Sequence, residues 1–148
     1  MGRNLKGVYS HESDEWSTPQ KLFDELDAEF GFDLDPCATD ENHKCDRYFT
    51  KVEDGLQHSW GGGTVFVNPP YSEISKWVAK CYYEGCKDNT TVVLLIPSRT
   101  DTKYFHNYIM HRAEIRFIKG RLKFNDGNGN APFPSMLVIF RGAETKRK

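Results

Sequence analysis

The sequence predicts a compact α/β domain with a mostly parallel sheet, an antiparallel pair of strands at its C-terminal end, and helices on both faces. Helical and strand patterns alternate along most of the chain, which is typical of a parallel sheet with helical crossovers. Residues 90–97 form a continuous apolar, β-branched run, as expected for a strand covered on both faces. The length of 148 residues fits a single domain, 1–148, with flexible ends expected at 1–13 and 142–148.

The first helix and the first strand are expected before residue 37. Thr18 and Pro19 predict a helix start, with Thr18 as the N-cap and proline at the first helical position. Gly31 predicts the end of this helix. Apolar residues recur between them at helical spacing, namely Phe23, Leu26 and Phe30. A short strand is expected in GFDLDP, and Pro36 stops it.

The other elements follow an irregular stretch, 37–63, whose length is typical of a functional loop. The turn-rich residues 126–130 are expected to join the last two strands. The expected elements are a strand at 64–67, a helix at 73–87, a strand at 90–97, a helix from Thr100 or Asp101, and strands at 113–118 and 135–140.

Composition excludes several classes of protein. Aromatic residues make up 14% of the chain, which is too many for a disordered protein. No apolar run approaches the roughly 18 residues of a membrane span and the N-terminus has no signal-peptide core, so we expect a cytoplasmic protein without a membrane partner. Reduced thiols and no metal site are expected, because the cysteines form no C-x-x-C pair and Cys37, His43 and Cys45 match no common zinc pattern.

Charge is divided unevenly along the chain. Residues 1–98 carry 9 Lys and Arg against 17 Asp and Glu, whereas residues 99–148 carry 11 against 4. A basic segment of this kind indicates a polyanionic partner on one face, and a solvated charged surface is the alternative.

The sharpest motif is NPPY, residues 68–71, directly after the strand at 64–67. The Asn68 side-chain oxygen and the Pro69 carbonyl are two acceptors able to grip both hydrogens of a planar NH2 group. This grip favours a pyramidal nitrogen with a localised lone pair, and Tyr71 can stack on the flat group. Rigid prolines keep the acceptors in place. A tight turn without chemistry is the alternative interpretation.

The sequence resembles the phage-type DNA N6-adenine methyltransferases, which use S-adenosyl-L-methionine. The similarity is co-linear over about residues 14–141 and is carried by DEWSTPQKLFDELDAEFGFDLDPCATDENHKCDRYFT, VNPPYSEISKWV, VVLLIPSRTDTKYFH, IRFIKGRLKF and APFPSMLVIF. It implies a compact Rossmann-like methyltransferase sheet and methyl transfer to the N6 amine of adenine, on a base flipped out of double-stranded DNA. It also implies that the target amine is held by Asn68, Pro69, Pro70 and Tyr71.

The resemblance implies a cofactor site in the first half of the chain. Thr18 and Pro19 are similar to the segment that packs against the methionine part of S-adenosyl-L-methionine. Asp35 is the candidate for its ammonium end, with Asp33 as the alternative on the same strand face, and Asp54 is the candidate for its adenosyl part. The loop after the strand adds Pro36, Cys37 and Ala38. Because this loop lacks the usual glycine, the cofactor grip is expected to differ in detail.

DNA contacts are expected in the basic C-terminal segment. The resemblance also implies that Phe133 or a neighbour covers the flipped base, whereas Phe117 is expected in the core. The candidates for phosphate contacts are Arg99, Lys103, Lys119, Arg121 and Lys123.

Two other functions use the same features. A protein-glutamine amide methyltransferase would grip an amide NH2 with the same NPPY motif, and a non-catalytic relic would keep only DNA binding. The target DNA sequence and the oligomeric state stay open, and any sequence recognition is expected from loops at 37–63 or 119–134.

Overall fold

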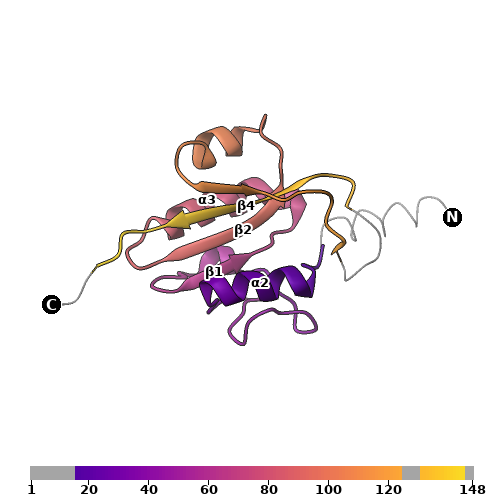
Figure 1. Ribbon diagram of the computed structural model, residues 1–148. Coiled ribbons are helices and arrows are strands. Elements are labelled where there is room, and N and C mark those ends of the chain that lie inside the picture. The colour runs from indigo at the N-terminus through magenta and orange to yellow at the C-terminus, as the bar shows by residue number, and fades with distance from the viewer. Residues whose placement is uncertain (1–15, 125–130, 146–148) are drawn as a thin grey trace.

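The computed structural model describes residues 16–124 and 131–145. One sheet has the strand order β1-β2-β4-β3, and helices α2 and α3 cover its opposite faces (Figure 1). The elements are α2 (Gln20–Phe30), η1 (Gly55–Gln57), β1 (Thr64–Val67), η2 (Tyr71–Glu73), α3 (Ile74–Gly85), β2 (Thr91–Pro97), η3 (Phe105–Ile109), β3 (Glu114–Phe117) and β4 (Ser135–Arg141). The α/β class and the helices on both faces are therefore confirmed.

The sheet is mixed, so the expectation of a mostly parallel sheet is wrong. β1 and β2 are parallel, but β4 lies between β2 and β3 and is antiparallel to both. The antiparallel pairing of the last two strands was expected; the insertion of β4 beside β2 was not. Residues 135–140 are all buried, and a run that is apolar on both faces carries no signal for the direction of its neighbours.

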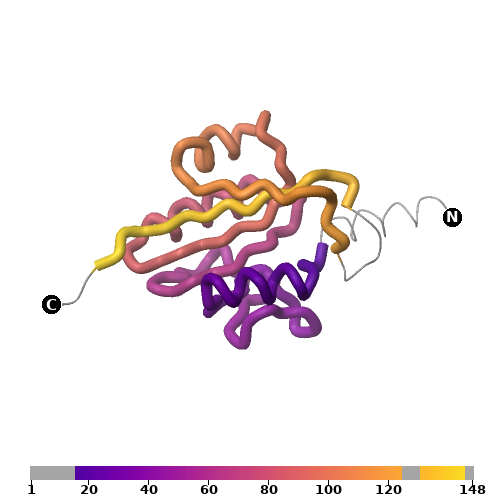
Figure 2. The backbone as a smooth tube through the Cα atoms, viewed as in Figure 1, coloured from indigo at the N-terminus to yellow at the C-terminus, as the bar shows by residue number. Residues whose placement is uncertain are grey.

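An extended segment, residues 33–35, adds to the outer edge of β1. The Asp33 amide donates to the Thr64 carbonyl at 2.7 Å, and the Phe66 amide donates to the Leu34 carbonyl at 3.0 Å. Leu34 and Asp35 form only single parallel bridges, so the expected strand is reduced to this short pairing before Pro36 ends it. The chain then folds into the irregular loops seen beside α2 in Figure 2.

Side chains alternate along the strands and build one core on each face. On one face, Val65 and Val67 of β1 pack with residues of α3 and η3. On the other face, Phe66 of β1 packs with Phe23 and Leu26 of α2. Both cores share the strands of a single sheet, so this sheet fixes the positions of all the loops at its edges.

Two helix starts differ from the expectation. α2 begins at Gln20 with Pro19 in the N-cap position; the proline side chain cannot accept a hydrogen bond, so the helix has no side-chain cap, and the Thr18 hydroxyl accepts from Asn68 instead. The helix expected after Thr100 or Asp101 is instead capped by Thr102, whose hydroxyl accepts from the Phe105 amide at 3.3 Å, and it continues as a short π-helical turn. The predicted end of α2 is confirmed: Gly31 has a left-handed conformation with φ 70°.

Some expectations concern the periphery of the fold. Phe117 is 67% exposed rather than buried, because it is the last residue of β3, an edge strand of the sheet. No helix in the described part of the chain is long and apolar enough to cross a membrane. Of the flexible ends expected at 1–13 and 142–148, residues 1–13 and 146–148 lie outside the described residues, as does the turn expected at 126–130. Gly142, Ala143 and Thr145 hydrogen-bond to Asn89 and Thr90.

Glu84 of α3 is a buried carboxylate that ties the loop before β1 to this helix. It accepts a hydrogen bond from the Trp60 amide at 2.8 Å and contacts the ammonium groups of Lys80 and Lys87, each at 2.9 Å. Burial by itself raises the pKa of Glu84, but the bonds from Lys80, Trp60 and Lys87 outweigh it, and the pKa lies below its ordinary value of 4.5. The ionised group therefore stabilises the folded state at neutral pH.

Glu84→Gln is expected to lower the free energy of unfolding by about 1–3 kcal/mol near neutral pH, because the variant loses charge-assisted hydrogen bonds in a buried site. A lowered pKa contributes stability above 4.5 that is lost as the pH falls through the folded value, so the difference from wild type should shrink in acid. Urea unfolding of wild type and variant, once near neutral pH and once below pH 4.5, measures the difference in the free energy of unfolding. The exposed Glu25→Gln variant is the control. A difference that stays constant with pH would contradict this role.

Candidate active site

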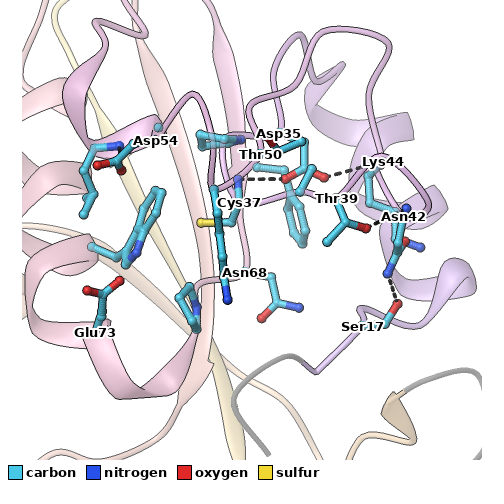
Figure 3. A pocket seen from close by; sticks show the side chains of 18 of the residues that line it. Ser17, Asp35, Cys37, Thr39, Asn42, Lys44, Thr50, Asp54, Asn68 and Glu73 are labelled. Carbon is cyan, nitrogen blue, oxygen red and sulfur yellow. Dashed lines mark hydrogen bonds between the residues drawn. The ribbon is translucent and has the colours of Figure 1, made fainter. Parts of the chain in front are cut away.

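A cavity of about 790 Å³ opens where β1 and the segment 33–35 end. Its walls come from residues 16–18 before α2, the loops 35–44 and 50–57, the end of β1 and the start of α3. Figure 3 shows labelled side chains from all these parts of the chain around one space. Chain segments more than 30 residues apart meet here because the two neighbouring strands are parallel and end at the same edge of the sheet.

The NPPY motif directly follows β1. Asn68 and Pro70 line the cavity, and Tyr71 begins η2 with its hydroxyl buried and without a hydrogen-bond partner among the described residues. Burial raises the pKa of Tyr71 well above its ordinary value; the neighbouring Tyr104 raises it further and the positive charge of Arg99 opposes the shift. The Tyr71 hydroxyl is therefore neutral at neutral pH.

The Asn68 side-chain amide is held at one end only. Its nitrogen donates to the main-chain carbonyl of Trp16 and, at 2.8 Å, to the hydroxyl of Thr18. Its oxygen is buried and has no hydrogen-bond partner in the part of the chain that the structure describes. Buried acceptors are nearly always satisfied in proteins, so an orphaned one at a cavity wall indicates a missing ligand.

Aromatic rings surround the NPPY motif. Trp16 lies nearly parallel to Tyr71, with ring centroids 6.4 Å apart and planes 16° apart. Phe133 meets Tyr71 edge to face at 5.3 Å, and Phe124 packs against Trp16 at 5.5 Å. Phe133, the residue expected to cover a flipped base, thus lies beside Tyr71, although it is mostly buried. Sequence reasoning missed Trp16, which has no motif signal beyond being an aromatic residue before Thr18.

Asp35 points into the cavity and organises the loop that follows it. Its carboxylate accepts from the Lys44 amide at 2.9 Å and from the Cys37 amide at 3.3 Å, and the residue is 5% exposed. Burial raises the pKa of Asp35 above its ordinary value, and the two amide donors oppose this shift. Among the described residues the Asp35 carboxylate forms no salt bridge; it is held by main-chain amides, and the nearby charges of Lys44 and His43 favour its ionised form only weakly.

Asp54 and Gly55 form the back of the cavity. Asp54 has a left-handed backbone with φ 61°, and its carboxylate accepts from the Leu56 amide at 3.1 Å. A Cβ atom on Gly55 would lie 2.4 Å from the Pro36 carbonyl oxygen, so the two loops meet main chain against main chain. Trp77 closes this wall, and its indole nitrogen is buried without a partner among the described residues.

The structure brings most of the expected cofactor residues together and separates two of them. Asp33 is exposed, lies outside the cavity lining and uses its carboxylate to accept from the Thr64 amide at 2.9 Å. Pro19 also lies outside the lining, at the start of α2. The expected residues that line the cavity are Thr18, Asp35, Pro36, Cys37, Ala38 and Asp54.

Three of the expected DNA-contacting residues, Arg99, Lys119 and Phe133, lie at the same end of the strands as the NPPY motif. β1, β2 and β3 run in one direction, so Asn68, Arg99 and Lys119 all follow carboxyl ends at this edge, while Phe133 precedes the start of β4 there. None of the basic candidates lines the cavity, and all are exposed: Arg99, Lys103, Lys119, Arg121 and Lys123. Arg116, by contrast, is bound by Glu29 and Glu114.

A family model and two phage relatives that match this chain carry the same description. A family model described as DNA N-6-adenine-methyltransferase (Dam) matches residues 7–148. A DNA N-6-adenine-methyltransferase of Escherichia phage T1 is 32% identical over an alignment of length 148, which covers 97% of this chain and 61% of the relative. Another, from Haemophilus phage HP1 (strain HP1c1), is 32% identical over 137 residues, 87% of this chain and 79% of the relative.

A shorter relative, the putative methyltransferase YfdM of Escherichia coli (strain K12), is 37% identical over 78 residues, 45% of this chain and 86% of that protein. The chain spans 61% of the length of the phage T1 relative. The family model covers nearly the whole chain, including every part of the cavity wall. The chain belongs to the DNA N-6-adenine-methyltransferase (Dam) family.

Proposed function

We propose that this protein transfers a methyl group from S-adenosyl-L-methionine to the N6 amine of adenine in double-stranded DNA. The observation that carries the proposal is the buried Asn68 oxygen at the end of β1, which faces an acidic cavity and has no hydrogen-bond partner among residues 16–124 and 131–145. The family membership and the names of its phage relatives support the same chemistry. The reaction would take place where DNA is accessible, in the cytoplasm of a bacterial or phage-infected cell.

The cavity suits a ligand with positive charge and a flat aromatic group. Its volume of about 790 Å³ lies within the usual range for small-molecule sites. Five acidic residues line it against three lysines, and Asp35 is the most buried of the acids. S-adenosyl-L-methionine supplies an electrophilic methyl group on a positively charged sulfur, along with an ammonium group. We assign Asp35 to the cationic end and Asp54 with Trp77 to the adenosyl end.

The Asn68 oxygen and the Pro69 carbonyl would accept the two hydrogens of the adenine amine. This contact favours a pyramidal nitrogen, so the N6 lone pair becomes available to attack the methyl carbon in line with the breaking sulfur–carbon bond. The nitrogen gains a methyl group and a positive charge, and then loses a proton to solvent. Tyr71 would stack on the adenine ring.

The edge that carries the NPPY motif would face the DNA. A duplex must release its adenine before N6 reaches the cavity, which requires both a grip on the phosphates and an aromatic surface for the base. Exposed basic residues after β2 and β3 would bind the phosphates, and Tyr71 with Phe133 would provide the aromatic surface for the base. Residues 1–148 would act as a single methyltransferase domain, since the two cores of the described residues share one sheet.

Asn68→Ala is expected to lower kcat by at least about 100-fold, because it removes an acceptor that acts on the reacting nitrogen. Binding of DNA and of S-adenosyl-L-methionine should persist. Nucleoside mass spectrometry of N6-methyladenine in a duplex substrate measures turnover, and exposed Asn107→Ala serves as the matched control. A wild-type protein that forms no N6-methyladenine would refute the proposed function.

Asp35→Asn is expected to weaken S-adenosyl-L-methionine binding by about tenfold or more, because the cavity loses its buried negative charge. Asp33→Asn, outside the cavity, should bind normally. The raised pKa means that Asp35 takes up a proton at a higher pH than an ordinary aspartate, so wild-type affinity should fall as the pH is lowered toward acid. Calorimetric titrations over a pH series test this, and equal losses in both variants would exclude the assignment.

Single alanine variants of Arg99, Lys119 and Arg121 are expected to weaken DNA binding for all sequences. Each should reduce the slope of log affinity against log salt by about 1, because one phosphate contact and its released counterion are lost. Arg116→Ala should leave the slope unchanged, since its guanidinium is already paired with Glu29 and Glu114. Fluorescence anisotropy at several salt concentrations provides the slopes; a slope that changes equally in Arg116→Ala would contradict the placement of DNA.

A further inference from the structure

We propose that Thr18, together with the main-chain carbonyl of Trp16, is a positioning device that sets the orientation of the Asn68 amide. The inference rests on the proposed function and deepens it. The resemblance places Thr18 in the cofactor site, whereas the geometry gives its hydroxyl a different task. Thr18 acts through Asn68 and is therefore a positioning residue rather than a catalytic one.

An asparagine amide has two unlike ends, and only one is useful here. Its oxygen accepts hydrogen bonds and its nitrogen donates them, while the two ends have nearly the same shape. An amine that must be gripped by acceptors needs the oxygen. With the amide reversed, the NH2 group would face another NH2 group, and the lone pair would gain no stabilisation.

The two hydrogen-bond partners of Asn68, the Trp16 carbonyl and the Thr18 hydroxyl, allow only one orientation of its side-chain amide. The Trp16 carbonyl is solely an acceptor, so the atom of Asn68 that faces it must be the nitrogen. The Thr18 hydroxyl, 2.8 Å from the same nitrogen, takes the second hydrogen. Both hydrogens of the Asn68 nitrogen are then used, and the oxygen is the end that no described residue binds.

The Thr18 hydroxyl bonds to Asn68 rather than capping the nearby helix α2. Threonine followed by proline is a favoured N-cap sequence, yet α2 begins one residue later, with Pro19 as its N-cap and no side-chain cap. The Thr18 hydroxyl bonds instead to a residue 50 positions away, and Thr18 is only 3% exposed. The helix end thus lacks its usual cap, while the Asn68 amide gains a partner.

The same short segment touches other parts of the site. The Trp16 ring stacks beside Tyr71, and the Ser17 hydroxyl lies 2.7 Å from the Asn42 amide nitrogen on the facing loop. Figure 3 shows Asn68 between the loop that carries Cys37 and the segment that carries Ser17. Residues 16–18 therefore connect the catalytic motif with the loop on the other side of the cavity.

Thr18→Val keeps the shape of the side chain and removes the hydroxyl. We expect kcat to fall by about tenfold or more, with the dissociation constants for S-adenosyl-L-homocysteine and for duplex DNA changed by less than about threefold. Thr18→Ser keeps the hydroxyl and should restore kcat to within about threefold of wild type. The matched control is Thr90→Val, which removes an equally buried, hydrogen-bonded hydroxyl at the opposite end of β2.

Asn68→Asp supplies a second test that does not depend on Thr18. A carboxylate provides acceptors for the amine, but it places an acceptor against the Trp16 carbonyl. We expect kcat to fall by about tenfold or more, as in Thr18→Val. Turnover near the wild-type value would overturn the inference, because it would show that residue 68 needs no donor on this side.

A spectroscopic measurement follows the amide directly. The side-chain NH2 signals of Asn68, assigned by their loss in Asn68→Ala, should be protected from exchange with water in the wild type, and Thr18→Val should reduce this protection. A Thr18→Val protein with normal kcat at saturating cofactor but weaker S-adenosyl-L-homocysteine binding would overturn the inference in favour of a direct cofactor contact. A wild-type protein without turnover would instead refute the proposed function itself, and this inference with it.

Discussion

The whole site depends on the parallel pairing of residues 33–35 with β1. Two main-chain hydrogen bonds, from Asp33 to Thr64 and from Phe66 to Leu34, hold these strands in register. Because the pairing is parallel, the chain leaves both strands at the same edge, and Asp35 and Asn68 come to line one cavity. Leu34 and Val65 are fully buried on this pair, so the packing of the core fixes the register of the two strands. This register in turn fixes the positions of Asp35 and Asn68 relative to each other.

The spacing of apolar residues predicted the helices and strands that form by burying one face or both faces of the element. Phe23 and Leu26 marked the buried face of α2, and the apolar run at 90–97 marked the central strand β2. The NPPY motif and Asp35 were expected at strand ends, where the structure has them. The roles assigned to these residues follow from chemistry and stay predictions until they are measured.

Other features depend on contacts between distant residues and could not be predicted. Strand period placed Asp33 and Asp35 on one face, but Asp33 turns to the Thr64 amide while Asp35 is held by Lys44 and Cys37. Thr18 had the local signature of an N-cap, yet its hydroxyl bonds to Asn68, 50 residues away. The exposure of Phe117 follows from the position of β3 at the sheet edge, which no local pattern encodes.

The contact between Gly55 and Pro36 limits how this cavity can change. Where two loops meet main chain to main chain, no side chain stands between them to be shortened or lengthened. An enlarged or altered ligand would have to be accommodated from the rim, where Lys51 and Val52 are exposed. Efforts to adapt the protein to modified methyl donors should therefore leave the back wall intact and vary the residues at its mouth.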